Sequence, residues 1–170
     1  MNAADDQTLT VDLDLDLQVA VESAELPGEP DFARWTAAAL EGRRECAALT
    51  IRIVAAQEAQ ALNLRFRGRD QPTNVLSFPF AAPPGLCGVD EMDDLLGDLV
   101  ICADVVQREA LEQGKAASAH WAHLVVHGVL HLLDYDHVTE SDAVVMEGLE
   151  TAILVKLGFP PPYEETPDSP

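Results

Sequence analysis

Apolar and polar residues alternate along the segment TLTVDLDLDLQVA, which covers residues 8–20. The odd-numbered positions from Leu9 to Val19 are apolar, whereas the even-numbered positions between them are polar and include three aspartates. A period of two residues predicts a β-strand with one buried face. The acidic residues on its other face disfavour edge-to-edge pairing with a further strand.

Three further segments have the apolar, β-branched composition of strands. They are LTIRIV (49–54), TNVLSFPF (73–80) and LGDLVICA (96–103). Proline lacks the amide hydrogen that a sheet ladder needs, so Pro79 predicts that its strand lies at a sheet edge or ends there. The segment AAPPGLCGVDEMDD (81–94) has no period and is expected to be a long loop.

Apolar residues recur at helical spacing in five segments. These are DFARWTAAALEG (31–42), AAQEAQALNLRFRG (55–68), residues 104–114, SAHWAHLVVHGVLHLL (118–133) and TESDAVVMEGLETAILVKLG (139–158). The expected N-terminal caps are Asp31, Asp104 and Thr139, and the expected glycine stops are Gly42, Gly114 and Gly158. Side-chain oxygens at a helix start accept hydrogen bonds from unpaired amides, and glycine readily adopts the conformation that ends a helix.

The mixed order of strands and helices predicts an α/β (α+β-like) fold. A chain of 170 residues, 48% of them hydrophobic, can form one core but is hardly long enough for two. We therefore expect a single domain over residues 1–158, with a small mixed β-sheet packed against several helices. The remaining residues, 159–170, are rich in proline and acidic groups and are expected to form a loose tail.

The formal net charge of the chain is −20, which repels nucleic acid at long range. Three of its ten Lys and Arg residues nevertheless cluster in the segment RFRGRD, as Arg65, Arg67 and Arg69. Two interpretations of this cluster are open from composition alone. The arginines either form a local positive site on an acidic body or pair with surface carboxylates.

The three cysteines, Cys46, Cys87 and Cys102, are odd in number and form no CxxC pair. This usage suits a reducing compartment better than a disulfide framework. The chain begins MNAADDQTLT, without the basic and apolar regions of a signal peptide, and contains no run of about 20 apolar residues. We therefore expect a cytoplasmic protein that does not enter a membrane.

The segment HGVLHLLDYDH (127–137) holds three of the five histidines of the chain. On a helix, His127 and His131 lie one turn apart and differ by about 40° around the axis, so their imidazoles can converge on one ion. A turn near Asp134 would bring His137 to the same point, since aspartate tolerates the left-handed conformation that such turns often need. Three imidazoles leave a fourth zinc position open for water, as in catalytic sites.

Other interpretations of these histidines are open. A histidine pair at this spacing on an apolar helix often only packs or forms hydrogen bonds within a core. His120 and His123 lie on the same stripe, toward the helix start, and are expected to pack, to support the metal ligands or to line a groove. Asp136 either orients a ligand imidazole or is an exposed carboxylate of the turn.

The histidine spacing also matches the zinc-protease pattern H-E-x-x-H-x-x-G-x-x-H. Here Gly128 stands at the Glu position and Asp134 at the Gly position. Because that Glu is the general base of the proteases, its absence argues against a peptidase. Glycine costs about 1 kcal/mol of helix stability relative to alanine, so we expect Gly128 to serve the close approach of a substrate or a neighbouring strand.

Together with LNLRFRGRDQPTNVLSFPF (62–80) and LLGDLVIC (95–102), the histidine segment closely resembles the bacterial YbeY family of metal-dependent endoribonucleases. The likeness runs from about Leu49 to about Gly158 and extends more faintly over the N-terminal strand and helix. Three motifs in the same order make it specific. One departure is Asp134, where the family's usual motif has glycine, and it puts water access and the charge beside the metal in question.

The resemblance implies one Zn²⁺ per chain, bound by His127, His131 and His137. It also implies that Arg67, which matches the family's functional arginine, acts in the substrate cleft. A guanidinium can hold two phosphate oxygens and offset the charge that grows on them in the transition state. Ser77 and Asp98 match family motifs too, and either supports the site or is structural.

The function implied by the resemblance is single-strand-specific cleavage of RNA in 16S ribosomal RNA maturation and ribosome quality control. The implied partners are ribosomal RNA, the small ribosomal subunit, an Era-type GTPase and a small-subunit ribosomal protein. Zinc is expected to lower the pKa of a bound water from 15.7 toward about 7. The sequence offers no obvious general base, so either this water or the 2′-hydroxyl of the substrate is the nucleophile.

Two other classes of function remain open. A non-catalytic ribosome assembly factor would use zinc only to hold the histidine helix. A zinc peptidase would need a base from outside the histidine segment. For the RNA enzyme, we expect binding through a small cationic cleft and through protein contacts on the ribosome, with weak affinity for naked RNA.

Overall fold

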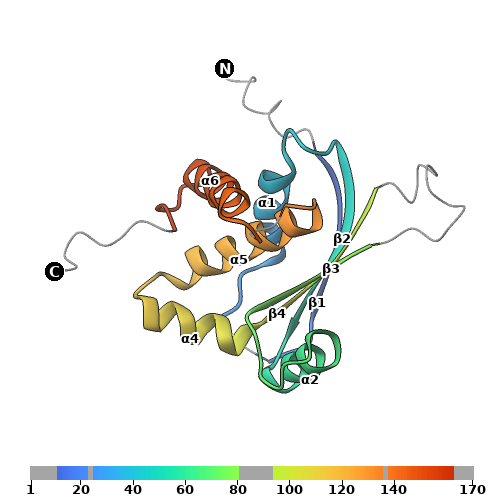
Figure 1. The fold of residues 1–170 in the computed structure, drawn as a ribbon, viewed down its shortest axis with the longest axis vertical. Helices are drawn as coiled ribbons and strands as arrows, with labels where there is room; N and C mark the ends of the chain where they lie inside the picture. Colours follow the sequence, from blue (N-terminus) through green and yellow to red (C-terminus); the bar gives the residue numbers. More distant parts are fainter. Residues whose placement is uncertain (1–10, 23–24, 81–93, 136–137, 163–170) are drawn as a thin grey trace, which may run out of the picture.

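The structure is a computed structural model, and it describes residues 11–22, 25–80, 94–135 and 138–162. Its elements run along the chain in the order shown in Figure 1. They are β1 (Asp12–Val19), α1 (Glu29–Leu40), β2 (Cys46–Val54), α2 (Ala56–Arg67), β3 (Val75–Pro79), β4 (Leu95–Cys102), α4 (Ala103–Gln113), α5 (Ala117–Leu132) and α6 (Glu140–Lys156). The predicted mixed α/β domain is confirmed.

Four strands form one mixed sheet in the order β1-β2-β4-β3. The first three are parallel to their neighbours, whereas β3 pairs with β4 in the antiparallel direction. β3 therefore lies at a sheet edge, and its last residue is Pro79, as the sequence predicted. The aspartates of β1 are exposed and its leucines are half-buried, which agrees with the predicted alternation, although Val19 at its end is 52% exposed.

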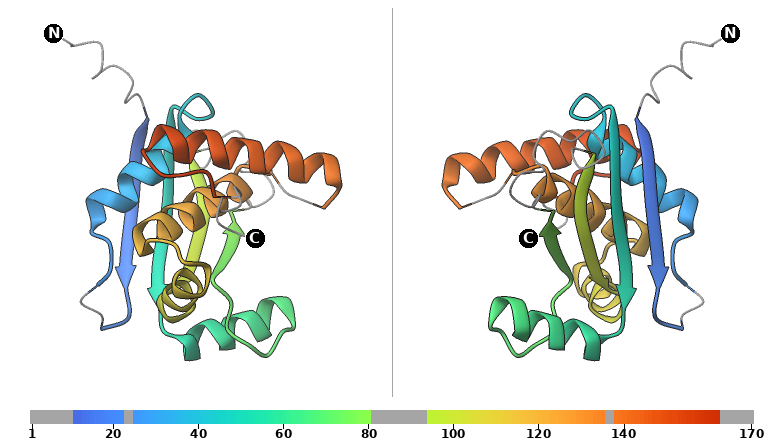
Figure 2. Two further views of the ribbon diagram at one scale, coloured as in Figure 1. Left: turned by 90° about the vertical axis from the view of Figure 1, so that its left-hand side faces the viewer. Right: turned by 90° about the vertical axis from the view of Figure 1, so that its right-hand side faces the viewer.

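Most helices lie on one face of the sheet, whereas α2 lies near one end of it (Figure 2). α1, α5 and α6 lie on one face and enclose the larger core, where Phe32 packs edge-on against Trp35 and Trp121. α2 lies against the other face, where a smaller core includes Val54, Ala59, Leu76 and Val100. Part of that second face is open to solvent, since exposed residues such as Asp98 and Leu95 lie on it.

Two of the three predicted helix caps are wrong. α1 begins after Gly28, and the Asp31 carboxylate instead accepts a hydrogen bond from the Gly28 amide at 3.3 Å. α4 begins one residue before Asp104, whose carboxylate accepts from the Ala56 amide at 3.0 Å and so caps the start of α2. Thr139 is confirmed as the cap of α6, because its hydroxyl accepts from the Asp142 amide at 3.0 Å.

The helix α5 crosses the centre of the larger core, and Gly128 sets how closely it approaches the sheet. A Cβ atom added at Gly128 would lie 2.7 Å from Cδ2 of Leu99, which is fully buried on β4. The expectation that a neighbouring strand requires this glycine is therefore confirmed. Close approach of α5 to the sheet brings its histidine face toward the edge strand β3.

The turn after α5 begins as predicted. Asp134 has φ of +78°, and it is the one non-glycine residue with positive φ among those whose backbone is described. The Tyr135 amide donates to the Leu130 carbonyl at 3.0 Å, which closes the helix end. Asp136 and His137, which follow, lie outside the described residues, as do Leu9, most of the predicted loop 81–94 with Cys87, and residues 163–170 of the tail.

Within the described part of the chain, no helix combines the length and the apolar character that crossing a membrane requires.

The contact between Gly128 and Leu99 leads to a stability prediction. We expect Gly128→Ala to lower the free energy of unfolding by about 1–2 kcal/mol, because overpacking against Leu99 outweighs the gain in helix propensity. Gly148→Ala is the matched control, since this exposed glycine of α6 has no atom within 4 Å of an added Cβ. It should raise stability by about 0.5–1 kcal/mol. Urea denaturation measures the free energy of unfolding of both variants, and an equal gain in stability in the two would contradict the prediction.

Candidate functional site

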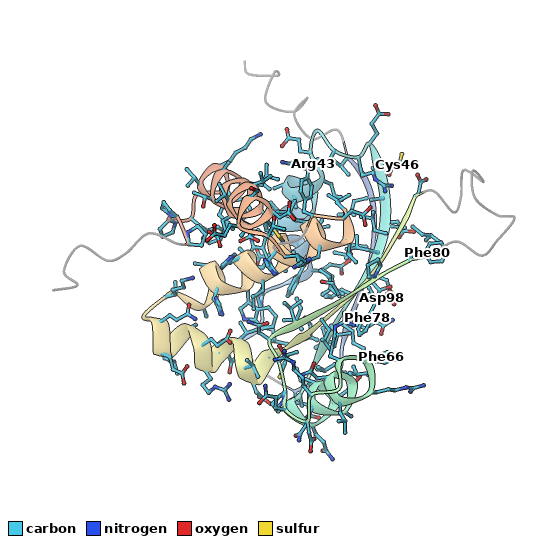
Figure 3. The ribbon with its side chains drawn as sticks, viewed as in Figure 1. Arg43, Cys46, Phe66, Phe78, Phe80 and Asp98 are labelled. Atoms are coloured by element: carbon cyan, nitrogen blue, oxygen red, sulfur yellow. The ribbon has the colours of Figure 1, made fainter. Side chains whose placement is uncertain are left out.

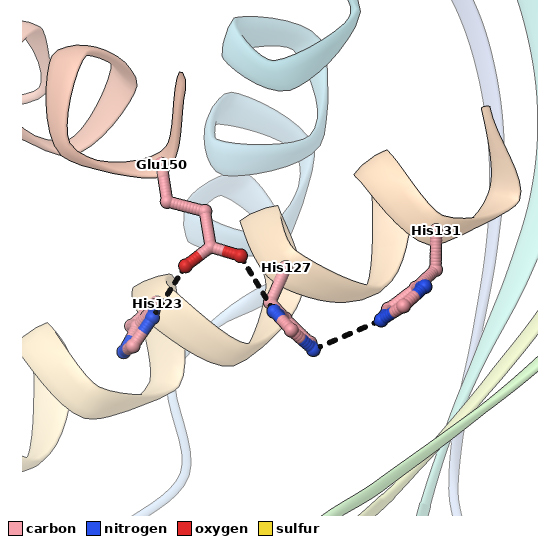
Figure 4. A network of polar contacts seen from close by, with 4 residues as sticks. All are labelled: His123, His127, His131 and Glu150. Atoms are coloured by element: carbon pink, nitrogen blue, oxygen red, sulfur yellow. Dashed lines mark hydrogen bonds and ion pairs between the residues drawn. The ribbon is translucent and has the colours of Figure 1, made fainter. Parts of the chain in front are cut away.

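A row of four histidines follows one face of α5, and three of them are drawn in Figure 4. The Nε2 atoms of His127 and His131 face each other at 3.1 Å. Their rings lie nearly perpendicular, with centroids 4.6 Å apart. The structure therefore brings together the first two of the three predicted ligands, with their outer nitrogens converging on one point.

The carboxylate of Glu150 lies behind this pair and is only 1% exposed. It comes from α6, and its two oxygens lie 2.5 Å from Nδ1 of His127 and 3.0 Å from Nε2 of His123. An ionised carboxylate only accepts hydrogen bonds, so a neutral His127 imidazole that donates to it through Nδ1 has its lone pair on Nε2. The outward-facing nitrogen of His127 is thus the one available to a ligand.

The two imidazoles fit a zinc site by their spacing and chemistry. Nitrogens at about 2.0–2.1 Å from a tetrahedral ion are about 3.3 Å apart, close to the observed 3.1 Å. A carboxylate on the far nitrogen of a ligand histidine is also a common feature of such sites. No group of three donors suited to a metal occurs among the described residues, and His137, the predicted third ligand, lies outside them.

Arg67 lies across a shared cavity from the histidine pair. It is the last residue of α2, and Gly68 ends the helix after it with φ of +74°. The guanidinium donates to the Ser77 carbonyl on β3 at 3.0 Å and lies over the Phe78 ring. A cavity of about 400 Å³ is lined by Arg67, His127 and His131, with β3 as its wall. The structure therefore places the predicted arginine and both histidines around one space.

The other cations near Arg67 have different surroundings. Arg52 is held by Glu58, with a nitrogen-to-oxygen distance of 2.7 Å, so it follows the ion-pair interpretation. Arg65 lies over the Phe66 ring, 5.2 Å from its centroid.

Asp98 is on the sheet face away from α5, near Phe78 and Phe80 in Figure 3, and it lines a cavity with Asp14 and Asp16. It does not line the cavity with the histidines.

A second polar cluster lies further along α5. Oε1 of Glu109 lies 2.9 Å from Nε2 of His120 and accepts a hydrogen bond from Nδ2 of the Asn74 side chain at 3.0 Å. Burial lowers the pKa of His120, and the hydrogen bond and charge of Glu109 act in the opposite direction. His120 therefore forms its hydrogen bond away from the predicted metal ligands, whereas His123 shares the Glu150 carboxylate with His127, one of those predicted ligands.

Sequence reasoning did not find Glu150, and one pattern could have revealed it. The buried positions of α6 are Met146, Glu150, Ile153 and Leu154, which follow helical spacing. Glu150 is thus an acidic residue in the apolar stripe of a helix. A buried carboxylate needs partners, so this position calls for donors such as the histidines of the neighbouring helix.

Two comparisons relate this chain to known proteins. The structure is similar to the solution structure of TM1509 from Thermotoga maritima, with a TM-score of 0.55 and 20% sequence identity. That likeness covers 91% of this chain and 99% of the other, and it indicates a shared fold. The family model of the endoribonuclease YbeY matches residues 21–158, which include the histidine row, Arg67 and Glu150. The chain therefore belongs to the YbeY family of endoribonucleases.

Proposed function

We propose that this protein is a metal-dependent endoribonuclease that cleaves single-stranded RNA during 16S ribosomal RNA maturation and ribosome quality control. One observation above all supports this proposal. Arg67 and the converging pair His127 and His131 line the same cavity, so a phosphate group and a metal ion would meet there. This combination suits phosphodiester cleavage better than peptide cleavage, because a guanidinium matches phosphate oxygens.

His127, His131 and His137 would hold one Zn²⁺. When bound, such an ion supplies Lewis-acid chemistry that makes water a stronger nucleophile at neutral pH. Glu150 fixes the tautomer of His127 by accepting the hydrogen bond from Nδ1, which leaves the lone pair of Nε2 to bind the metal. Three imidazoles also suit other divalent transition metals.

Arg67 would bind the scissile phosphate. One of its terminal nitrogens is engaged by the Ser77 carbonyl, and this contact with the edge strand limits the positions of the guanidinium. A fixed cation offsets the negative charge that develops on the phosphate oxygens without reorganising during the reaction. The edge position of β3 matters here, since the open side of the strand faces the substrate rather than another strand.

The setting of the activity is proposed from the same family. The substrate would be ribosomal RNA on the small ribosomal subunit, with an Era-type GTPase and a small-subunit ribosomal protein as partners. A chain with net charge −20 would gain little from long-range attraction to RNA, so contacts on the ribosome would supply part of the binding free energy. Cys46 and Cys102 are free, which suits the reducing cytoplasm.

The first prediction from this proposal tests the metal site. His131→Ala should reduce RNA cleavage more than about 100-fold, because loss of a ligand should exceed the 10–100-fold cost of losing a supporting partner. Cleavage of a short single-stranded RNA, metal content and circular dichroism are measured together, with chelator-treated wild type as the control. A folded variant that contains no metal and still cleaves would refute the metal-dependent enzyme. A folded zinc protein that never cleaves would favour the assembly factor.

The second prediction concerns Glu150. Glu150→Gln should weaken zinc binding about 10–100-fold, because an amide cannot accept from both histidines. Glu147→Gln is the matched control, an exposed position on the same helix, and it should bind zinc like the wild type. Competition with a chromophoric chelator measures both affinities. Equal affinity in the two variants, both folded, would show that Glu150 does not support the ligand.

The third prediction concerns the guanidinium of Arg67. Arg67→Lys keeps the charge but loses the two-pronged contact, so kcat/KM should fall about tenfold or more while the zinc content stays constant. Arg69→Lys makes the same chemical change two residues away, at a residue that is exposed. It should change kcat/KM less than about twofold. A similar loss in both variants would mean that general positive charge, rather than Arg67, promotes cleavage.

A further inference from the structure

A second cavity, of about 410 Å³, adjoins the one around Arg67. The two cavities share Asn74, Val75 and His127, so they are neighbours beside α5, and we call the two together the groove. The remaining lining residues of the second cavity come from α4, the α4–α5 connection, α5 and the C-terminal segment: Glu109, Gln113, Lys115, His120, His123, Leu124 and Pro162. Seven residues separate His127 from His120, which is about 10 Å of helix axis. The groove therefore continues well beyond the position of the predicted metal.

Lys115 is the cation of this second cavity. It lies in the short connection between α4 and α5 and is partly buried. No carboxylate of the described chain lies within ion-pair distance of its ammonium group, whereas Lys156, the other lysine, pairs with Glu41 at 3.0 Å. Burial lowers the pKa of Lys115, and the charge of Glu109 raises it. An anion in the cavity would stabilise the charged form in the same way as Glu109 does.

Polar groups of other elements line the same cavity as Lys115. Asn74 and His120 both contact one oxygen of Glu109, so this carboxylate is held between β3 and α5. Gln113 adds an amide from α4. Carboxylates and amides form hydrogen bonds with base edges, which are exposed in single-stranded RNA and hidden in a duplex.

A second metal ion is a poorer occupant of this cavity. Glu109 already has two hydrogen-bond partners on one oxygen, and the described residues form no cluster of three suitable donors. A lysine ammonium lining the same space would also repel a cation. A ligand with an anionic group for Lys115 and a polar, planar part for the amides and the carboxylate matches the groups that line this cavity.

We propose that this second cavity binds the nucleotide next to the scissile phosphate of a single-stranded RNA, with the phosphate of that nucleotide on Lys115. The inference rests on the proposed cleavage of RNA beside Arg67. It adds a direction to the substrate, which would run from the pair His127 and His131 along α5 toward the start of that helix. It also assigns a binding role to Lys115.

Substitution of the two lysines tests this subsite. Lys115→Gln and Lys156→Gln change the net charge equally, and only the first affects the groove. Cleavage of a hexanucleotide is compared with cleavage of a dinucleotide, which has only the scissile phosphate. In Lys115→Gln, the ratio of the hexanucleotide kcat/KM to the dinucleotide kcat/KM should fall about tenfold, as for loss of a charged hydrogen bond. Lys156→Gln should leave this ratio unchanged.

The salt dependence of kcat/KM for the hexanucleotide gives an independent readout. Loss of one phosphate contact on a single strand should reduce the slope of log kcat/KM against log salt by about 0.7. An unchanged ratio and slope in Lys115→Gln, or equal changes in both variants, would overturn the subsite. Fluorescence anisotropy of a labelled hexanucleotide measures binding directly. It therefore distinguishes failure of the Lys115 subsite from failure of the proposed RNA cleavage. If the wild type binds but never cleaves, and only Lys115→Gln weakens binding, the subsite stands and the cleavage proposal fails.

Discussion

The hydrogen bonds of the buried Glu150 carboxylate are the interaction on which the site depends. A buried, unpaired charge costs several kcal/mol, so the carboxylate must be satisfied by donors in the folded state. Both of its oxygens contact histidines of α5, and these two contacts tie α6 to α5 at a defined register. The same contacts fix which nitrogen of His127 faces outward. The contacts that join the two helices are therefore also the ones that orient the His127 imidazole, the first of the proposed metal ligands.

Packing around α5 then determines what the histidines face. Gly128 allows α5 to approach Leu99 on β4, and the histidine row lies beside the edge strand β3 as a result. β3 in turn holds Arg67 through the Ser77 carbonyl, although Arg67 belongs to a helix on the opposite side of the sheet. Two helices from different faces thus contribute to one cavity because it is located where the sheet ends. If β3 were a central strand, the sheet would separate the two helices.

The sequence predicted most of this fold but not the contacts that surround the histidines, and the differences have physical reasons. Alternation and helical spacing are local, so the strands, the helices and the edge position of Pro79 were all predictable. Asp104 was misassigned because its partner, the Ala56 amide, lies 48 positions away and no local pattern reveals it. Glu150 and Glu109 were missed for the same reason, since their histidine partners belong to other helices. Arg67 and the histidines were found only because short motifs carry them.

The acidic composition of the chain is compatible with an RNA substrate because some of its cations pair with surface carboxylates whereas others line the groove. Arg52, Arg108 and Lys156 are paired with carboxylates on the surface, where they add little to the field felt by an approaching strand. Arg67 and Lys115 instead line the groove. Beyond the Debye length of about 8 Å at physiological salt, the acidic exterior is screened and repels only weakly. Under the proposed function, short-range contacts within the groove would therefore decide which strands bind.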